Sequence, residues 1–172
     1  MDDIQNRTLE AVQDRDLNKL KLILDSLTSV WNHLGGNDYS LLHHLCECRW
    51  SEGLELALSY RESIDFIDRF DDFSWTPLII ASRENDLNSV KMLLECGAGV
   101  NAHEEAKIGN TALIEAVDAG NEKIVDLLLL HGADPAITGW MQMNAFDKAK
   151  YRFEKSGNPV DQRILRAIEK GI

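Results

Sequence analysis

The chain has 172 residues, of which 44% are hydrophobic, and its formal net charge is −11 at pH 7. A chain of this length can bury a sizeable core, whereas its acidic excess would repel phosphate backbones and argues against nucleic-acid binding. No hydrophobic run approaches the length that crosses a membrane, and the acidic start Met1-Asp2-Asp3 does not resemble a secretory signal. With three cysteines, which without a signal suggest reduced thiols, these features predict a cytoplasmic protein.

Two weak copies of one pattern come first, over residues 1–36 and 37–70. Each predicts two short helices, the second of which carries hydrophobic groups such as Ile23-Leu24 on one face. The copy that begins at Ser40 reads SLLHHLCECRWSEGLELALSYRESI and lacks the Gly-Ala ending of the later copies. Degenerate copies are expected at the end of a repeat array, where one face meets water.

Two clear copies, Thr76–Ala98 and Thr111–Ala133, follow within the segments 71–105 and 106–138, 35 residues apart and without a gap. They read TPLIIASRENDLNSVKMLLECGA and TALIEAVDAGNEKIVDLLLLHGA. In each, the threonine can cap a first helix, and a polar break leads into a second helix with a Leu-Leu pair. Gly97 and Gly132 then end the second helices, where we expect positive φ.

The last copy covers residues 139–172. Asn144-Ala145-Phe146 aligns with the start of the preceding copy, and Gly157-Asn158 repeats its break after an insertion of four residues. A final hydrophobic face follows, with Ile164 and Ile168. Since no helix pair could bury its hydrophobic face alone, about five pairs must stack into a solenoid, which we expect to be monomeric.

The repeat period and the order Thr-Pro-Leu, Leu-Leu, Gly-Ala-Asp resemble the ankyrin repeat. The resemblance covers nearly the whole chain and implies an all-α ankyrin-type solenoid of stacked antiparallel helix pairs with short β-hairpin-like tips. It also implies a non-catalytic protein–protein interaction module without cofactor or metal. Members of the family contact partners through the tips that precede each threonine and through exposed positions of the first helices.

Mapped onto this chain, the tips are 37–39, 72–75, 107–110 and 140–143, and the helix positions are 47–48, 83–84, 118–119 and 151–152. Many of these residues are large and hydrophobic, and Trp, Tyr and Met are enriched in interface cores. We expect a partner to contact Tyr39, Asp71, Asp72, Phe73, Trp75, Arg83, Glu84, Ile108, Asn110, Asp118, Trp140, Met141, Met143 and Tyr151. Phe73 and Trp75 could instead pack against neighbouring tips.

The charge is unevenly distributed. Residues up to Ile137 include 25 acidic and 11 basic groups, a sum of −14, whereas the residues from Thr138 onward sum to +3. Such an acidic body would steer a basic partner toward the chain, or it could serve solubility alone. A small acidic ankyrin protein resembles immunity or antitoxin proteins that mask a toxin, and a general adaptor or regulatory scaffold is the alternative.

One region could suggest a different class of function. His43, His44, Cys46 and Cys48 lie close together in the sequence, as in a metal-dependent enzyme. Their spacing does not match that of closed zinc sites. His43 also occupies the position of the histidine that, in proteins resembling this one, bonds to backbone between repeats. We therefore expect a structural histidine and no catalytic residue.

Overall fold

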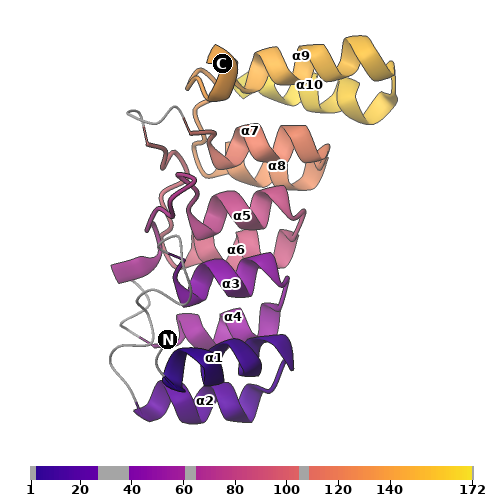
Figure 1. Cartoon of the computed structure of the whole chain (residues 1–172). Helices are drawn as coiled ribbons and strands as arrows, with labels where there is room; N and C mark the ends of the chain where they lie inside the picture. The colour runs from indigo at the N-terminus through magenta and orange to yellow at the C-terminus, as the bar shows by residue number, and fades with distance from the viewer. Residues whose placement is uncertain (1–2, 27–38, 61–64, 105–108, 172) are drawn as a thin grey trace.

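The computed structural model describes residues 3–26, 39–60, 65–104 and 109–171. Within these residues, ten α-helices form five pairs that stack from α1–α2 at one end to α9–α10 at the other (Figure 1). The first pairs are α1 (Asp3–Gln13) with α2 (Leu17–Ser26) and α3 (Leu41–Glu47) with α4 (Ser51–Leu58). The later pairs are α5 (Pro77–Arg83) with α6 (Leu87–Glu95), α7 (Ala112–Ala119) with α8 (Glu122–Leu130), and α9 (Ala145–Ser156) with α10 (Pro159–Gly171).

The helices form two layers. α3, α5, α7 and α9 pack side by side in one layer, and α2, α4, α6, α8 and α10 pack side by side in the other. Between the layers lies a continuous core whose leucines, such as Leu42, Leu78, Leu93 and Leu128, have no exposed surface. The predicted all-α solenoid of stacked helix pairs is confirmed.

The helix ends follow from the residues that were expected to form them. Thr76 accepts a hydrogen bond from the Ile79 amide with its side chain, at 3.3 Å, and Thr111 does the same for the equivalent helix. Gly97 and Gly132 end α6 and α8 with φ of 92° and 84°, a backbone region that glycine adopts at little cost.

The tips are hairpin-like only in their turns. The Asp71 amide donates to the Trp75 carbonyl at 3.0 Å, and the Gly139 amide donates to the Met143 carbonyl at 2.9 Å. No strand is formed in the part of the chain that the structure describes. The last tip contains a short 3-10 helix, η3 (Trp140–Gln142).

The last pair differs from the others in length. α9 has 12 residues where α7 has 8, which agrees with the expected insertion, and Gly157 ends it with φ of 61°. In Figure 1, α9 and α10 consequently extend beyond the ends of the preceding pair. Among the described residues, no helix is long and hydrophobic enough to cross a membrane.

Candidate functional site

The tip before α5 is organised by Asp71. Its Oδ1 accepts hydrogen bonds from the backbone amides of Phe73, at 2.9 Å, and Trp75, at 2.8 Å. Only 2% of Asp71 is exposed, because the side chain folds back under the turn that it stabilises. The expectation that Asp71 itself meets a partner is therefore wrong. Asp72, the next residue, is exposed as expected.

Three of the predicted contact residues form one cluster at this tip. Phe73 is 59% exposed, and its ring lies 5.6 Å from that of Trp75, centroid to centroid. The Arg83 guanidinium covers the Trp75 ring, with Cζ 4.3 Å from the ring centroid, a favourable cation–π geometry. Trp75 is half-buried and also packs on the core. We call Phe73, Trp75 and Arg83 the aromatic tip.

His43 connects the aromatic tip to the preceding helix pair. Its Nε2 lies 3.0 Å from the Trp75 carbonyl oxygen, and its Nδ1 lies 3.1 Å from the Ser40 amide nitrogen. Since a carbonyl can only accept, Nε2 carries the proton and Nδ1 accepts from Ser40. Burial lowers the pKa of His43 to about 4, so the ring is neutral near pH 7. The expected structural role of His43 between repeats is confirmed.

The residues around His43 are arranged for packing. The Tyr39 ring lies 5.1 Å from the His43 ring and 4.9 Å from the His44 ring, and Tyr39 is half-buried. Cys46 has no exposed surface, and burial raises the pKa of its thiol well above the usual range. Both ring nitrogens of His43 are engaged with Ser40 and Trp75.

Four other predicted contact residues meet at the C-terminal end of the stack. Asp118, Met141, Met143 and Tyr151 line one cleft of about 560 Å³ between α7, the last tip and α9. The remaining residues that line this cleft are polar or charged: Lys148, Arg152, Lys155, Ser156, Asn158 and Asp161. We call this space the α7–α9 cleft.

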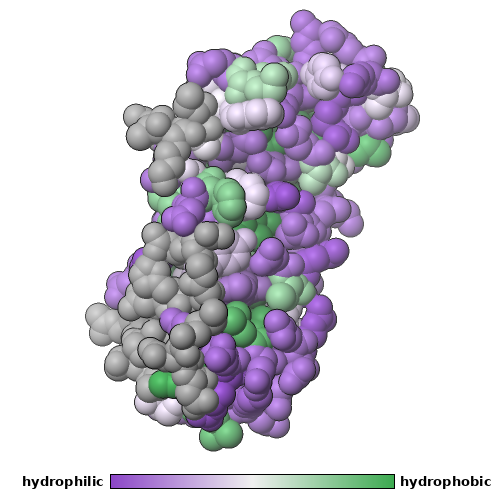
Figure 2. All heavy atoms as spheres, viewed as in Figure 1, coloured by the Kyte–Doolittle hydropathy of each residue, from purple (hydrophilic) through white to green (hydrophobic). Residues whose placement is uncertain are grey.

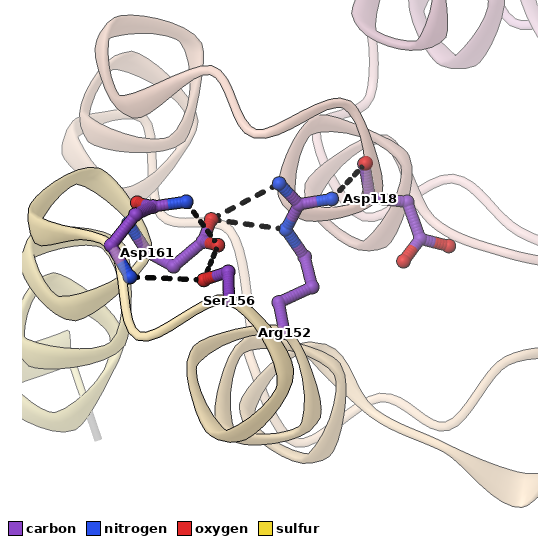
Figure 3. Close-up of polar contacts among 5 residues, drawn as sticks. Asp118, Arg152, Ser156 and Asp161 are labelled. Carbon is purple, nitrogen blue, oxygen red and sulfur yellow. Dashed lines mark hydrogen bonds and ion pairs between the residues drawn. The ribbon is translucent and has the colours of Figure 1, made fainter.

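The wall of the α7–α9 cleft is a polar network around Asp161, which is 2% exposed (Figure 3). Arg152 donates to Asp161 Oδ1 from Nε, at 3.1 Å, and from Nη2, at 3.0 Å. Ser156 donates to Asp161 Oδ2 at 2.5 Å. Burial alone would raise the pKa of Asp161, but these hydrogen bonds outweigh it and the pKa is lowered. Asp161 therefore stays ionised within this network near pH 7.

Arg152 also joins the last pair to the preceding one. Its Nη1 donates to the Asp118 carbonyl oxygen at 2.6 Å, and Lys148 pairs with the Asp118 carboxylate at 2.8 Å. Figure 3 shows the guanidinium between Asp161 and Asp118. A Cβ on Gly120 would lie 2.5 Å from Arg152 Nη2, so the glycine leaves room for this bridge. In the repeat pattern, Gly120 belongs to the polar break between the two helices of its copy, and this pattern does not predict the contact with Arg152.

The last tip presents two hydrophobic side chains to solvent. Trp140 is 63% exposed and Met141 is 65% exposed. The Trp140 amide donates to Asn110 Oδ1 at 2.9 Å, while the Asn110 side chain donates to Glu115 at 2.7 Å. Met141 adopts φ of 63°, an uncommon region for a residue with a side chain. Asn110 thus positions the tip, with its own polar groups already engaged.

The remaining predicted contacts lie elsewhere on the surface. Glu84 is half-buried at the end of α5, whereas Ile108 lies outside the described residues. Figure 2 shows that the visible face is mostly hydrophilic, with the hydrophobic groups in small separate patches. The expected contact residues therefore form local clusters, of which the aromatic tip and the α7–α9 cleft are two.

Comparison with known proteins finds one family across the chain. A family model described as ankyrin repeats (3 copies) matches residues 9–104, and a model of a single ankyrin repeat matches residues 108–140.

Curated relatives include the probable E3 ubiquitin-protein ligase XBOS34 of Oryza sativa subsp. japonica, 38% identical over 69% of this chain and 21% of the relative. The B-cell lymphoma 3 protein homolog of Mus musculus is 34% identical over 74% of this chain and 28% of its own length. The 2-5A-dependent ribonuclease of Homo sapiens is 50% identical over 35% of this chain and 8% of its length. The similarity thus spans only a minor part of each relative.

Proposed function

Because the chain belongs to the ankyrin-repeat family, whose repeats bind other proteins, we propose that it is a non-catalytic module that binds and neutralises a basic protein. In this role it would mask its partner as an immunity or antitoxin protein masks a toxin. The observation that carries the proposal is the aromatic tip, an exposed aromatic group on a fixed turn within an acidic chain.

The aromatic tip has the composition and the rigidity of a binding hot spot. Aromatic residues and arginine dominate the energetics of protein interfaces. Asp71 and His43 both bond to the backbone of this turn, so its conformation exists before a partner arrives. A preformed tip loses little conformational entropy on binding, which favours affinity.

The acidic body supports a basic partner. The described part of the stack that surrounds the tip belongs to the segment up to Ile137, whose charges sum to −14. Long-range attraction accelerates encounter more than it strengthens the final complex. We therefore expect the association rate to fall as salt shortens the Debye length below about 10 Å, with little change in dissociation. An association rate that does not change with salt concentration would indicate that the acidic charge serves solubility and does not steer a partner.

The partner can be captured at the tip. A photo-crosslinking amino acid in place of Phe73 should capture a basic protein in the source cell, identified by mass spectrometry. The matched control carries the same group at Leu22, which is 70% exposed on α2, a helix of the other layer. Capture of the same proteins at both positions would indicate nonspecific contact.

The captured partner then allows a quantitative test. Phe73→Ala should weaken binding by about tenfold or more while changing stability by less than about 0.5 kcal/mol, because the ring is largely exposed. Leu22→Ala removes an exposed hydrophobic group from α2 and should leave affinity unchanged. Equal affinity of the Phe73 variant and the wild type, measured by calorimetry, would move the interface away from the aromatic tip.

A general adaptor is the second candidate. In its favour, the relatives contain the matched region as a small part of a much longer chain, 21% in the rice protein and 28% in the mouse protein. An adaptor should hold two proteins at once, whereas a neutralising protein should form a complex with one. Size-exclusion chromatography with light scattering of the captured complex separates the two.

The metal-dependent enzyme is the third candidate and requires the ring nitrogens of His43 to leave Ser40 and Trp75. Those two hydrogen bonds support our proposal of a non-catalytic chain. Elemental analysis of the purified protein is the direct test. Stoichiometric zinc that is lost in His43→Gln would overturn the proposal.

A further inference from the structure

The α7–α9 cleft has the size and the lining of a binding site. Its volume of about 560 Å³ lies within the range of ligand pockets, roughly 300–1,000 Å³. Met141, Met143 and Tyr151 supply its hydrophobic surface. Methionine side chains adapt to the shape of what they contact, and they are common at surfaces that accept varied hydrophobic groups.

The charges of the cleft do not cancel. Its two carboxylates are both paired, Asp161 with Arg152 at 3.0 Å and Asp118 with Lys148 at 2.8 Å. The third cation, Lys155, lies over the Tyr151 ring, with Nζ 4.9 Å from the ring centroid. Among the described residues, no carboxylate forms an ion pair with Lys155. The cleft therefore keeps one positive charge beside an exposed aromatic ring.

The surrounding sequence adds to this charge. The residues from Thr138 onward, which supply most of the cleft, sum to +3, whereas the rest of the chain sums to −14. A basic partner steered to the acidic repeats would be repelled from this end. An acidic segment would be attracted to it, so charge complementarity identifies the occupant.

The cleft is also held in shape before any occupant binds. The bridge from Arg152 to the Asp118 carbonyl and to Asp161 ties the two helices that form its walls. The tip that carries Met141 is held by the hydrogen bond from the Trp140 amide to Asn110 Oδ1. A rigid wall with adaptable methionines suits the insertion of one side chain from a peptide.

We propose that the α7–α9 cleft binds a short acidic segment of a protein. A hydrophobic or aromatic side chain of that segment lies among Met141, Met143 and Tyr151, and a neighbouring carboxylate contacts Lys155. The occupant differs in charge from the basic surface proposed for the aromatic tip, so the two sites take segments of opposite charge, and one bound protein can supply both.

Methionine-methyl NMR tests this proposal directly. The probe is a short peptide with a central tryptophan flanked by aspartate and glutamate, and the control peptide has lysines in place of the acidic residues. The acidic peptide should shift the methyl signals of Met141 and Met143 in a saturable manner and leave that of Met92, on α6, unchanged. The basic peptide should shift neither. Equal shifts with both peptides, or no shift with the acidic peptide, would overturn the proposal.

Two charge reversals provide the matched variants. Lys155→Glu should lower the affinity for the acidic peptide by about fivefold or more, because a partly exposed favourable charge contact is replaced by a repulsive one. Lys91→Glu makes the same change on α6, where Lys91 pairs with Glu95 on the exposed surface, and should have no effect. Wild-type affinity in Lys155→Glu would contradict the proposal. Phe73→Ala should leave binding of the acidic peptide unchanged. The proposal for the cleft and the proposal for the aromatic tip are therefore tested independently.

Discussion

The neutral, buried His43 makes the stability of this protein depend on pH in a specific window. Its pKa is about 4 in the folded chain and about 6.5 when unfolded, which corresponds to roughly 3 kcal/mol of stability. The folded state resists protonation, so this contribution is complete above pH 6.5. It is lost as pH falls from 6.5 toward 4, because the unfolded chain takes up a proton that the folded chain does not. Below pH 4 both states are protonated and the dependence ends.

The assay compares wild type with His43→Gln by chemical denaturation between pH 7.5 and 4. The variant loses hydrogen bonds and should be less stable at pH 7.5, but the gap should narrow by about 3 kcal/mol as pH falls to 4. Carboxylates elsewhere contribute equally to both proteins and cancel in the difference. NMR titration of the imidazole gives the folded pKa directly. A constant gap, or a folded pKa near 6.5, would refute the burial argument.

Two further predictions concern the stack itself. Leu128→Ala should destabilise the protein by about 2–5 kcal/mol, because the side chain has no exposed surface, whereas Leu130→Ala, two residues on and 82% exposed, should have little effect in the same denaturation assay. Equal losses would show that the helix face is misassigned. Asp161→Asn should cost roughly 2–4 kcal/mol, because it leaves the partly buried Arg152 without its carboxylate. Glu122→Gln removes the solvent-accessible ion pair with Arg163 and should change stability little. A larger loss of stability in Glu122→Gln than in Asp161→Asn would contradict the importance of the Asp161 network.

The helices and their ends could be predicted because their signals are local. A threonine cap, a polar break and a closing glycine act within a few residues, so Thr76, Thr111, Gly97 and Gly132 adopt the expected conformations. The repeat spacing then places each helix pair against the next. His43 was also predictable, since its position in the repeat implied a backbone contact across the interface.

The interior of the candidate sites was not predictable in the same way. Asp71 stands beside exposed tip residues in the sequence, and only the path of the turn decides that its carboxylate points inward. Arg152 and Asp161 lie nine residues apart on different helices, and their contact depends on the angle between α9 and α10. No local pattern encodes that angle. The ion pair with Lys148 also offsets the negative charge of Asp118. Only the structure shows that Lys155 remains the uncompensated cation of the cleft.

The two candidate sites share one construction, and this gives the Asp161 variant a second consequence. Each site combines a tip with the first helix that follows it, and its exposed side chains, such as Phe73 and Met141, lie at the surface of the stack. In a solenoid each pair contacts only its neighbours, so damage to the last pair spreads weakly toward the first. Asp161→Asn should therefore loosen the α7–α9 cleft and lower its affinity for the acidic peptide, while the aromatic tip still binds its basic partner. Hydrogen exchange should rise in α9 and α10 and stay unchanged in α5. Loss of both binding activities together would show that the stack responds as one cooperative unit, which the separate sites do not require.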